Sequence, residues 1–417
     1  MNRTLLLHTQ RIRPRFSSLL KPTPSTLSTL STRIRAEHHQ SYHLPPETHP
    51  HAATILSFPS QHSVPASHYT PLKHEIINLA ATISAFEPVR LYTRPEDIPS
   101  VRSLLRARLE DSPQTQNQIH ILPCLTNHCW ARDTGPVYVF SSTWGRFAVD
   151  FGFCEWGGKN LDPAEQVDGE EWPIMGPERL TENAQFARRV IDSDVSPSPV
   201  TRVASRVRLE GGGIEVDGEG TLLATESSIL CPVRNPGLPK GDVERELQRV
   251  LGVRKLIWFP GRRGLDITDC HVDAAVRFVR PGVVVVSRPF SQRRGLVSEW
   301  NEVYGEICEV LERETDALGR KLEVNVVEEP DPRFVVGGES VVSGEEGPAA
   351  SYVNFYFVNG GIVVPVFGDP VADEAAVEMF QRLVPERVVR TVRVNAMPRM
   401  GGVLHCVTQQ VPLSGAS

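Results

Sequence analysis

Apolar residues recur every three to four positions in three segments, which is the spacing of one buried face of an α-helix. The first segment spans residues 72–86. The second spans residues 242–251 and is followed by Gly252, a residue type that commonly ends helices. The third spans residues 300–311 and carries acidic residues along its outer face. The pattern therefore predicts three amphipathic helices.

Short apolar runs lie between these segments and predict strands, several of them buried. Alternation of helices with strands is typical of the α/β and α+β classes. Segments rich in Gly, Pro, Ser or acidic residues predict loops, but none is clean enough to separate two domains, and no sequence repeat is evident. The predicted strands are residues 137–140, 221–225, 283–287, 355–358 and 362–366, and the predicted loops are residues 157–176, 193–199 and 328–347.

The composition narrows the class of protein. With 417 residues, against roughly 150 for a typical domain, the chain holds either two domains or one large repetitive domain. Its 40% hydrophobic and 23% charged residues are typical of a globular protein with a sizeable core. The net charge of −6 offers no basic surface for nucleic acid, and no apolar run is long enough to span a membrane. Seven cysteines without regular spacing favour a reducing compartment over a disulfide scaffold.

The first 36 residues differ from the remainder because they hold seven basic residues and no acidic one, among many Ser and Thr. This composition is typical of an organellar transit peptide, and it fits a disordered tail that targets nothing equally well. We therefore expect residues 1–42 to be a leader or tail and residues 43–417 to be the globular body. The expected location is cytoplasmic, or mitochondrial if residues 1–36 are a transit peptide.

A candidate nucleophile lies late in the chain, in the segment GGVLHCVTQQ. If residues 403–408 form a strand, side-chain alternation places His405 and Cys406 on opposite faces, so His405 is not the base for its neighbour. A cysteine needs help from its surroundings to become a thiolate. Taken alone, Cys406 is more often a buried, inert thiol.

A candidate general acid and base lies in the segment TDCHVDAAVRF. In an extended chain His271 and Asp273 share one face, and a carboxylate beside a histidine favours its charged form. The same pair also fits a salt bridge at a strand end. Cys270, Cys124 and Cys129 lack further ligands at zinc spacing, so we expect no metal site.

Two further acidic residues accompany apolar runs. Asp133 precedes a predicted strand in WARDTGP, and Glu210 precedes three glycines in LEGGGIEVDGEG, where the backbone could approach another group closely. The later glycines of this segment, at positions 218 and 220, read as a hairpin turn and not as a dinucleotide-binding loop. Each acid alone is more often a helix cap or a surface group.

Together these residues suggest one chemistry. Asp133, Glu210 and Asp273 could surround a planar cation, since carboxylates match a guanidinium in bidentate geometry. The Cys406 thiolate could then attack the central carbon, while His271 protonates the leaving amine and later activates water. Composition and spacing alone support this only weakly.

The chain resembles the agmatine deiminases and the bacterial-type peptidylarginine deiminases, which are guanidino-group modifying enzymes. The resemblance runs from about residue 44 to residue 412 and keeps the order of the family's motifs. The matching stretches are PPETHPH, NHCWARDTGP, LEGGGIEVDGEGTLLATE, RNPGLPK, TDCHVD, DALGRKLEV, SYVNFYFVNGGIVVPVFGD and GGVLHCVTQQ.

The resemblance implies a role for each candidate. Cys406 would be the nucleophile and His271 the general acid and base, while Asp273 and Asp133 would bind the guanidinium. Glu210 would contact the guanidinium and hold the histidine. The implied route passes through a covalent amidino-cysteine, releases ammonia and gives a ureido product, with no metal or organic cofactor.

The fold implied by the resemblance is a five-module pseudo-symmetric α/β propeller, the pentein fold, with a central active-site pocket. The spacing is compatible, because Asp133 to Glu210 is 77 residues, Glu210 to His271 is 61, and His271 to Cys406 is 135, about two modules. Residues 43–417 would then form a single catalytic domain. Trp130 and Asp269, which flank the catalytic candidates in the sequence, are also expected to bind substrate.

Four positions depart from the family pattern. His128 stands where the family usually has Asp, Cys270 where it has Gly, Phe58 where it commonly has Trp, and Gly213 where it has Asn or a small polar residue. These departures flank the expected pocket and bear on recognition of the substrate tail. A second thiol beside the site is conceivable at Cys270, although inert packing is the simpler interpretation.

We expect hydrolysis of agmatine to N-carbamoylputrescine and ammonia. One alternative keeps the chemistry on free or peptidyl arginine, giving citrulline, and another is a non-catalytic guanidinium-binding protein. The expected partner is a small cationic guanidino molecule, not nucleic acid or a membrane, and a homodimer is a possible assembly.

Overall fold

The computed structural model describes residues 41–110, 118–142, 145–159, 166–167, 170–171, 175–194, 200–290, 299–336 and 349–414. The leader expected at residues 1–36 lies outside the described residues, as do parts of the three predicted loops. Residues Ser41–Ser417 form one compact unit.

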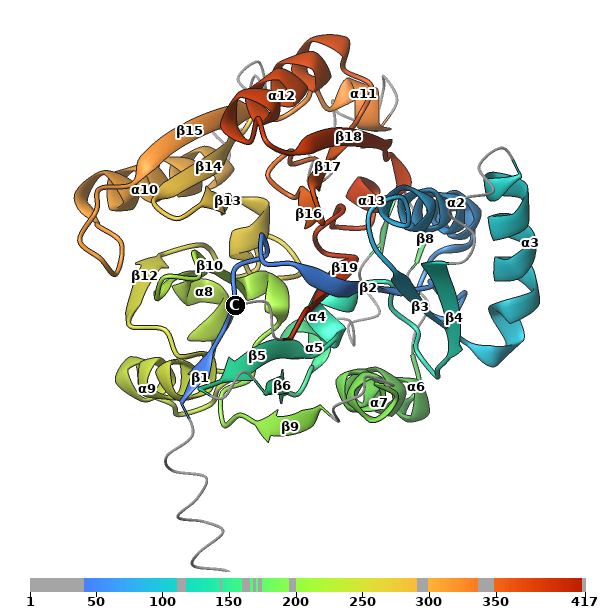
Figure 1. Ribbon diagram of the computed structural model, residues 1–417, viewed down its shortest axis with the longest axis horizontal. Coiled ribbons are helices and arrows are strands. Elements are labelled where there is room, and N and C mark those ends of the chain that lie inside the picture. Colours follow the sequence, from blue (N-terminus) through green and yellow to red (C-terminus); the bar gives the residue numbers. More distant parts are fainter. Residues whose placement is uncertain are drawn as a thin grey trace, which may run out of the picture. The chain divides into compact units, whose positions relative to one another are not determined.

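Five small sheets surround the centre of this unit and repeat one plan (Figure 1). In each sheet a first strand pairs antiparallel with a second, and the chain then passes through a helix to a third strand that pairs parallel with the second. Three sheets contain this plan alone. They are β10 (Ile214–Val216), β11 (Thr221–Thr225) and β12 (Lys255–Phe259); β13 (Val276–Arg280), β14 (Val283–Arg288) and β15 (Glu323–Glu328); and β16 (Tyr356–Val358), β17 (Gly361–Val366) and β18 (Val388–Arg393).

The other two sheets add one strand each to the same plan. In the last sheet the late strand β19 pairs with the early strand β2, so that Thr408 lies opposite Leu56 and the ring of sheets closes. These sheets are β1 (Tyr42–His43), β5 (Val137–Ser141), β6 (Arg146–Asp150) and β9 (Thr201–Ala204); and β19 (Thr408–Pro412), β2 (His51–Ser57), β3 (Val89–Thr93) and β4 (Ile119–Pro123).

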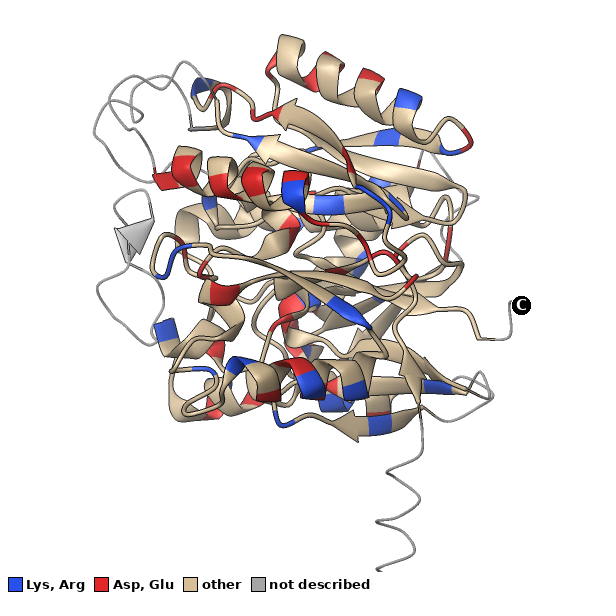
Figure 2. Ribbon diagram, turned by 90° about the vertical axis from the view of Figure 1, so that its left-hand side faces the viewer, with Lys and Arg blue, Asp and Glu red and all other residues tan. Residues whose placement is uncertain are grey.

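The longer helices lie on the outside of the ring, where each covers its sheet (Figure 1). The three helices predicted from periodicity are confirmed as α2 (Ala66–Ile83), α9 (Lys240–Leu251) and α10 (Glu299–Arg313). Acidic residues recur along α10, as expected (Figure 2). The other helices of this kind are α3 (Ile98–Leu109), α6 (Pro177–Ala184), α7 (Phe186–Asp192) and α12 (Pro370–Leu383).

Among the described helices, none is both long and apolar enough to cross a membrane.

Short elements connect the modules. The short elements are α4 (Ala131–Thr134), α5 (Glu155–Gly158), α8 (Glu226–Ile229), α11 (Arg333–Val336), α13 (Ala396–Arg399), the 3-10 helices η1 (Pro95–Asp97), η4 (Gly211–Gly213) and η5 (Val272–Ala274), and the strands β7 (Gln166–Val167) and β8 (Glu170–Glu171).

All five predicted strands are confirmed, since they correspond to β5, β11, β14, β16 and β17. Their residues are almost entirely buried because each strand packs between its helix and the neighbouring modules. The predicted hairpin turn between β10 and β11 is also confirmed. The length of the chain is therefore explained by five repeated modules, which form the predicted α/β propeller.

Candidate active site

The candidate residues occupy one recurring place, the connection just before the first strand of a module. This place faces the centre of the ring in each module, so residues far apart in the chain meet there. The five connections hold Asp133 before β5, Glu210 before β10, His271 and Asp273 before β13, Asn354 before β16, and Cys406 before β19.

His271 lies among the carboxylates. Its Nε2 is 3.1 Å from Glu210 Oε2, and its Nδ1 is 3.7 Å from Asp133 Oδ1. Burial alone would lower the pKa of His271, but the charges of Asp133, Glu210 and Asp273 outweigh it and raise that pKa to about 9. The ring is therefore an imidazolium at neutral pH, the form that can donate a proton.

A glycine allows this close approach. Gly212 donates its N–H to Asp133 Oδ1 at 3.1 Å, and a Cβ at this position would lie 2.7 Å from His271 Nδ1. The close backbone approach predicted for the three glycines is thus confirmed. Burial raises the pKa of Asp133, as do the charges of Asp273 and Glu210, although His271 partly offsets the effect.

Arg234 ties two of the acids together from behind. Its Nε lies 3.0 and 2.9 Å from the two oxygens of Glu210, and its Nη1 donates to Asp269 Oδ2 at 2.6 Å. Asp269 Oδ1 accepts from Lys159 Nζ at 2.5 Å and from the N–H of Gly264 at 2.7 Å. Both oxygens of Asp269 are therefore occupied, and Asp269 stands behind the acids and not beside the thiol.

Cys406 lies in a turn, not in a strand. Residues 404–407 form this turn and β19 begins only at Thr408, so the strand predicted over residues 403–408 is wrong. The Cys406 Sγ is 3.3 Å from Asn354 Nδ2 and 3.6 Å from Asp273 Oδ2. Burial raises the pKa of the Cys406 thiol well above its usual value, and the charges of Asp273 and Asp133 add to the effect.

Asp273 is the carboxylate nearest the thiol and is fully buried. Its Oδ2 accepts a 2.6 Å hydrogen bond from His405 Nδ1, whereas its Oδ1 has no partner among the described residues. Residues 272–274 form η5, so the extended face on which the sequence placed His271 and Asp273 is also wrong. The two side chains still reach the same site because the short turn directs both toward the centre.

A small cavity of about 20 Å³ opens beside the thiol. Trp130 lines it, as expected of a substrate-binding residue, and Asp133 is the charged residue among the described residues of its wall. The lining residues are Trp130, Asp133, Trp156, Ile267, Thr268, Met400, Gly401 and Cys406.

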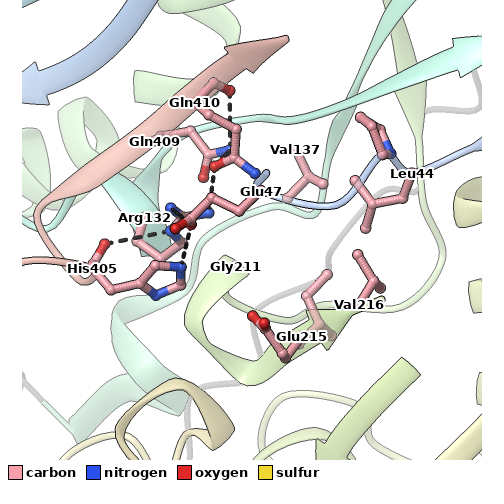
Figure 3. A pocket seen from close by; sticks show the side chains of 12 residues that line it. Leu44, Glu47, Arg132, Val137, Gly211, Glu215, Val216, His405, Gln409 and Gln410 are labelled. Atoms are coloured by element: carbon pink, nitrogen blue, oxygen red, sulfur yellow. Dashed lines mark hydrogen bonds and ion pairs between the residues drawn. The ribbon is translucent and has the colours of Figure 1, made fainter. Parts of the chain in front are cut away.

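A second cavity lies beside His405 (Figure 3). Its wall holds His405, Glu47, Arg132 and Glu215 together with apolar residues of β5 and β10. Cys406 and His405 line different cavities, yet both side chains contact Asp273 Oδ2, at 3.6 and 2.6 Å. The opposite-face arrangement predicted from a strand is therefore wrong, and His405 contacts the site through Asp273.

Backbone strain marks two segments of the site. Glu155 and Trp156 have φ of 54° and 49°, and Asp269 and Cys270 have φ of 63° and 65°. Such left-handed conformations cost about 1 kcal/mol or more each for residues other than glycine. Hydrogen bonds hold them in place, because Trp156 Nε1 donates to Asp133 Oδ2 at 2.8 Å and Asp269 binds Arg234.

The positions that depart from the family pattern pack near these segments. His128 Nε2 is 2.8 Å from Glu155 Oε2, and its ring lies edge-on to Trp156 with centroids 5.1 Å apart. The Cys270 thiol is buried and bonds to the Arg262 backbone, which agrees with inert packing. Phe58 is buried in the core, and a Cβ at Gly213 would lie 3.7 Å from the His271 ring.

Four contributors were not singled out from the sequence, namely Trp156, Arg234, Asn354 and Glu47. Three of them lie inside stretches that match the family, Arg234 in RNPGLPK, Asn354 in SYVNFYF and Glu47 in PPETHPH. The family motifs therefore contained the information that could have identified them. Nothing local marks Trp156. Among the described residues, no group of three or more His, Cys, Asp or Glu has the geometry to hold a metal ion.

The fold and site together define a class, an enzyme with a cysteine nucleophile poised among carboxylates for hydrolysis of a C–N bond in an amidine. The family described as Porphyromonas-type peptidyl-arginine deiminase matches residues 43–412. The chain belongs to this family.

Individual relatives agree with that assignment. An agmatine deiminase of Stutzerimonas stutzeri (strain A1501) is 32% identical over 400 residues, which cover 93% of this chain and 99% of the relative. An agmatine deiminase of Pseudomonas aeruginosa (strain LESB58) is 33% identical over 382 residues, with 89% and 95% covered. The solved agmatine deiminase of Enterococcus faecalis superposes with a TM-score of 0.74 at 26% identity, covering 89% of this chain and 96% of that one.

Proposed function

We propose that this protein hydrolyses agmatine to N-carbamoylputrescine and ammonia. The observation that carries the proposal is the Oδ1 of the buried Asp273, which has no partner among the described residues, in a carboxylate whose other oxygen, Oδ2, lies 3.6 Å from the Cys406 sulfur. A buried charged oxygen without a partner is costly, and the N–H groups of a guanidinium would satisfy it. The carboxylates of Asp133 and Glu210 both lie close to the His271 ring, at 3.7 and 3.1 Å.

Substrate binding would prepare the nucleophile. Without substrate, burial and two carboxylates keep the pKa of Cys406 high, so the thiol holds its proton. A guanidinium between Asp133 and Asp273 brings a positive charge next to the sulfur and favours the thiolate. The amide of Asn354, 3.3 Å from the sulfur, donates a hydrogen bond to that anion.

The first half-reaction forms a carbon–sulfur bond. The Cys406 thiolate attacks the central guanidino carbon, and the His271 imidazolium gives its proton to one terminal nitrogen. The carbon–nitrogen bond then breaks, ammonia leaves, and an amidino group remains on Cys406. Glu210 holds the His271 ring at 3.1 Å throughout, and Arg234 holds Glu210.

The second half-reaction reverses the protonic roles. Neutral His271 accepts a proton from water, and the hydroxide adds to the amidino carbon. The carbon–sulfur bond breaks, and the sulfur of Cys406 leaves and takes up the proton that the new hydroxyl loses, which gives the ureido product and restores the thiol. The proton that the thiol gave up at the start leaves with ammonia as ammonium. The described residues supply the nucleophile, the acid and base, and the cation-binding carboxylates.

The choice of agmatine over free arginine rests on charge. Free arginine carries an α-carboxylate that needs a cation or donors near the guanidinium pocket, whereas agmatine carries none. The described residues that line the cavity include the acid Asp133 and no Lys or Arg. Lys159 and Arg234 bond to the segment behind this wall, and both are already engaged by Asp269. Relatives that are agmatine deiminases support the same choice.

One assay tests the proposal. The purified full chain is offered agmatine, free arginine and a blocked arginine peptide, and both ammonia and the ureido product are measured. Turnover of agmatine with kcat/KM at least about 100-fold above arginine is expected, the size of one well-placed polar contact. Turnover of the peptide alone would show that peptidyl arginine, and not agmatine, is the substrate. Absence of turnover with all three compounds would refute the proposal that the protein is an enzyme.

We further propose that residues 43–417 act as one catalytic domain and that residues 1–36 target the chain to mitochondria. The acid-free, Arg-rich composition of the leader supports this. Mass spectrometry of the protein isolated from its own cells tests it. An N-terminus near residue 40 in a mitochondrial fraction is expected, and an intact Met1 in the cytosolic fraction contradicts it.

A further inference from the structure

We propose that His405 is a positioning residue for deimination, which holds Asp273 by Oδ2, the oxygen 3.6 Å from the Cys406 sulfur, and so leaves Oδ1 for the guanidinium. This inference rests on the proposed function. It gives the residue next to the nucleophile in the sequence a purpose different from that of the nucleophile itself.

The contacts of His405 are specific at both ring nitrogens. Its side chain is buried, its Nδ1 is 2.6 Å from Asp273 Oδ2, and its Nε2 is 2.9 Å from Glu47 Oε2. An ionised carboxylate only accepts hydrogen bonds, so both contacts are hydrogen bonds only when both nitrogens carry protons. The geometry therefore favours an imidazolium between two carboxylates.

Glu47 is fixed from behind. Its Oε2 also accepts from Arg132 Nη2 at 3.0 Å, its Oε1 accepts from the N–H of Phe357 at 2.9 Å, and Arg277 Nη2 forms an ion pair with Oε1 at 2.9 Å. Burial opposes ionisation of Glu47, but Arg277 and His405, with Arg132, outweigh it and lower its pKa well below the usual value. Glu47 is thus a fixed anion against which the His405 ring is aligned (Figure 3).

The backbone fixes how these two neighbouring residues approach Asp273. Asn354 Oδ1 accepts from the N–H of His405 at 2.9 Å and from the N–H of Cys406 at 3.3 Å. These bonds fix the turn so that the imidazole and the thiol reach the same oxygen, Asp273 Oδ2, at 2.6 and 3.6 Å, while the thiol also lines the cavity beside Trp130. Asp273 is then clamped at Oδ2, and Oδ1 is left for a ligand.

Two amide variants separate the two contacts. The side-chain nitrogen of Asn can occupy the place of Nδ1, and that of Gln the place of Nε2. His405→Asn should therefore keep the bond to Asp273 and a kcat/KM within about fivefold of the parent, whereas His405→Gln should fall at least about 50-fold, as expected for a lost hydrogen bond to a charged group. Equal losses in both variants, following their Tm, would overturn the proposal.

The pH profile of kcat/KM distinguishes a positioning role from a merely structural one, because a structural role would leave the profile unchanged. Burial opposes ionisation of Asp273, but the hydrogen bond and charge of His405 outweigh it, and the pKa of Asp273 is lowered. The groups that face Asp273 are His405, His271, Arg277, Asp133 and Cys406. His405→Gln should shift the acid limb of kcat/KM to higher pH, and His405→Asn should not; an unmoved limb in His405→Gln contradicts the proposal.

Nuclear magnetic resonance of the ring nitrogens tests the geometry without turnover. His405, assigned through the variants, should show protons on both Nδ1 and Nε2 at pH 7 in the wild-type chain. A bare Nδ1 would overturn the proposal. If wild type turned over no agmatine yet both protons were present, the proposed function would fail while the clamp on Asp273 stood, so the two failures are distinguishable.

Discussion

On the thiol side of the centre, Asp273 Oδ1 has no partner among the described residues, whereas on the opposite side both oxygens of Glu47 accept hydrogen bonds, from Arg132 and from the N–H of Phe357. Glu47 also forms ion pairs with Arg277 and His405, so its buried charge is compensated within the protein. The charge of Asp273 is compensated only at Oδ2. We infer from this difference that the thiol side is completed by a cation, and that the contacts around His405 keep Asp273 in place for it.

The largest effect should come from the nucleophile. Cys406→Ser should lower agmatine turnover by at least about 10⁴-fold, since a hydroxyl among carboxylates does not ionise at neutral pH. Far-ultraviolet circular dichroism and Tm should match the parent. Cys231→Ser, another buried thiol that lies away from both cavities, is the control and should keep normal turnover. Substantial activity in Cys406→Ser would refute the nucleophile.

The next effect should come from the acid and base. His271→Ala should lower kcat by about 10³-fold, within the range for a lost general acid. His405→Ala should lower it less, because His405 acts only through Asp273. Parallel steady-state measurements decide the order, and equal losses would remove the distinction between the two sides.

The pH dependence should report the same histidine. The pKa of His271 is raised to about 9, so its imidazolium is present below that pH and is lost as pH rises through it. The kcat/KM should therefore fall about tenfold per pH unit above about 9. A falling limb centred near 6.5, the ordinary histidine value, would contradict the arrangement of carboxylates around the ring.

A smaller effect on turnover, with a large one on stability, should come from the opposite side. Arg277 is fully buried and pairs with Glu47 and Glu215, so Arg277→Met removes the cation of Glu215 and leaves Glu47 with Arg132 and His405. The free energy of unfolding should fall by about 3–5 kcal/mol. The exposed pair Arg188–Asp192 is the control, and Arg188→Met should change it by under about 1 kcal/mol in urea titrations.

The smallest effect should come from Cys270. Replacement by glycine relieves the left-handed backbone at φ 65° but removes a buried side chain. These contributions nearly cancel, so Cys270→Gly should change stability by under about 1 kcal/mol and turnover by under about twofold. A loss of turnover above tenfold would show that this thiol takes part in the site.

Local sequence was enough to predict three of the longer helices and five of the strands. The helix over residues 242–251 was predicted from its periodicity and from Gly252, which ends α9 at φ 70°. Both signals are contained in neighbouring residues, so no distant contact is needed. The residues that converge on the centre were predicted mainly from the motifs of the resemblance, because neither periodicity nor spacing states which connections meet.

Local sequence could not predict the turn at Cys406. Alternation of apolar residues indicated a strand over residues 403–408, yet Asn354 takes the N–H groups of His405 and Cys406, and pairing with β2 starts only at Thr408. These partners come from distant parts of the chain and override the local pattern. Arg234 was not predicted for the same reason, because its role is to join Glu210 to Asp269 across modules.

The pairing of β19 with β2 also fixes when the enzyme becomes competent during folding. Thr408 and Leu56 are 352 positions apart, so this contact has a large loop-closure cost and belongs among the slow, late events. Cys406 immediately precedes β19 and reaches the carboxylates only as that strand docks. A chain in which β19 has not yet paired with β2 therefore holds the thiol apart from the cation-binding carboxylates. The pairing that closes the ring of sheets also assembles the active site.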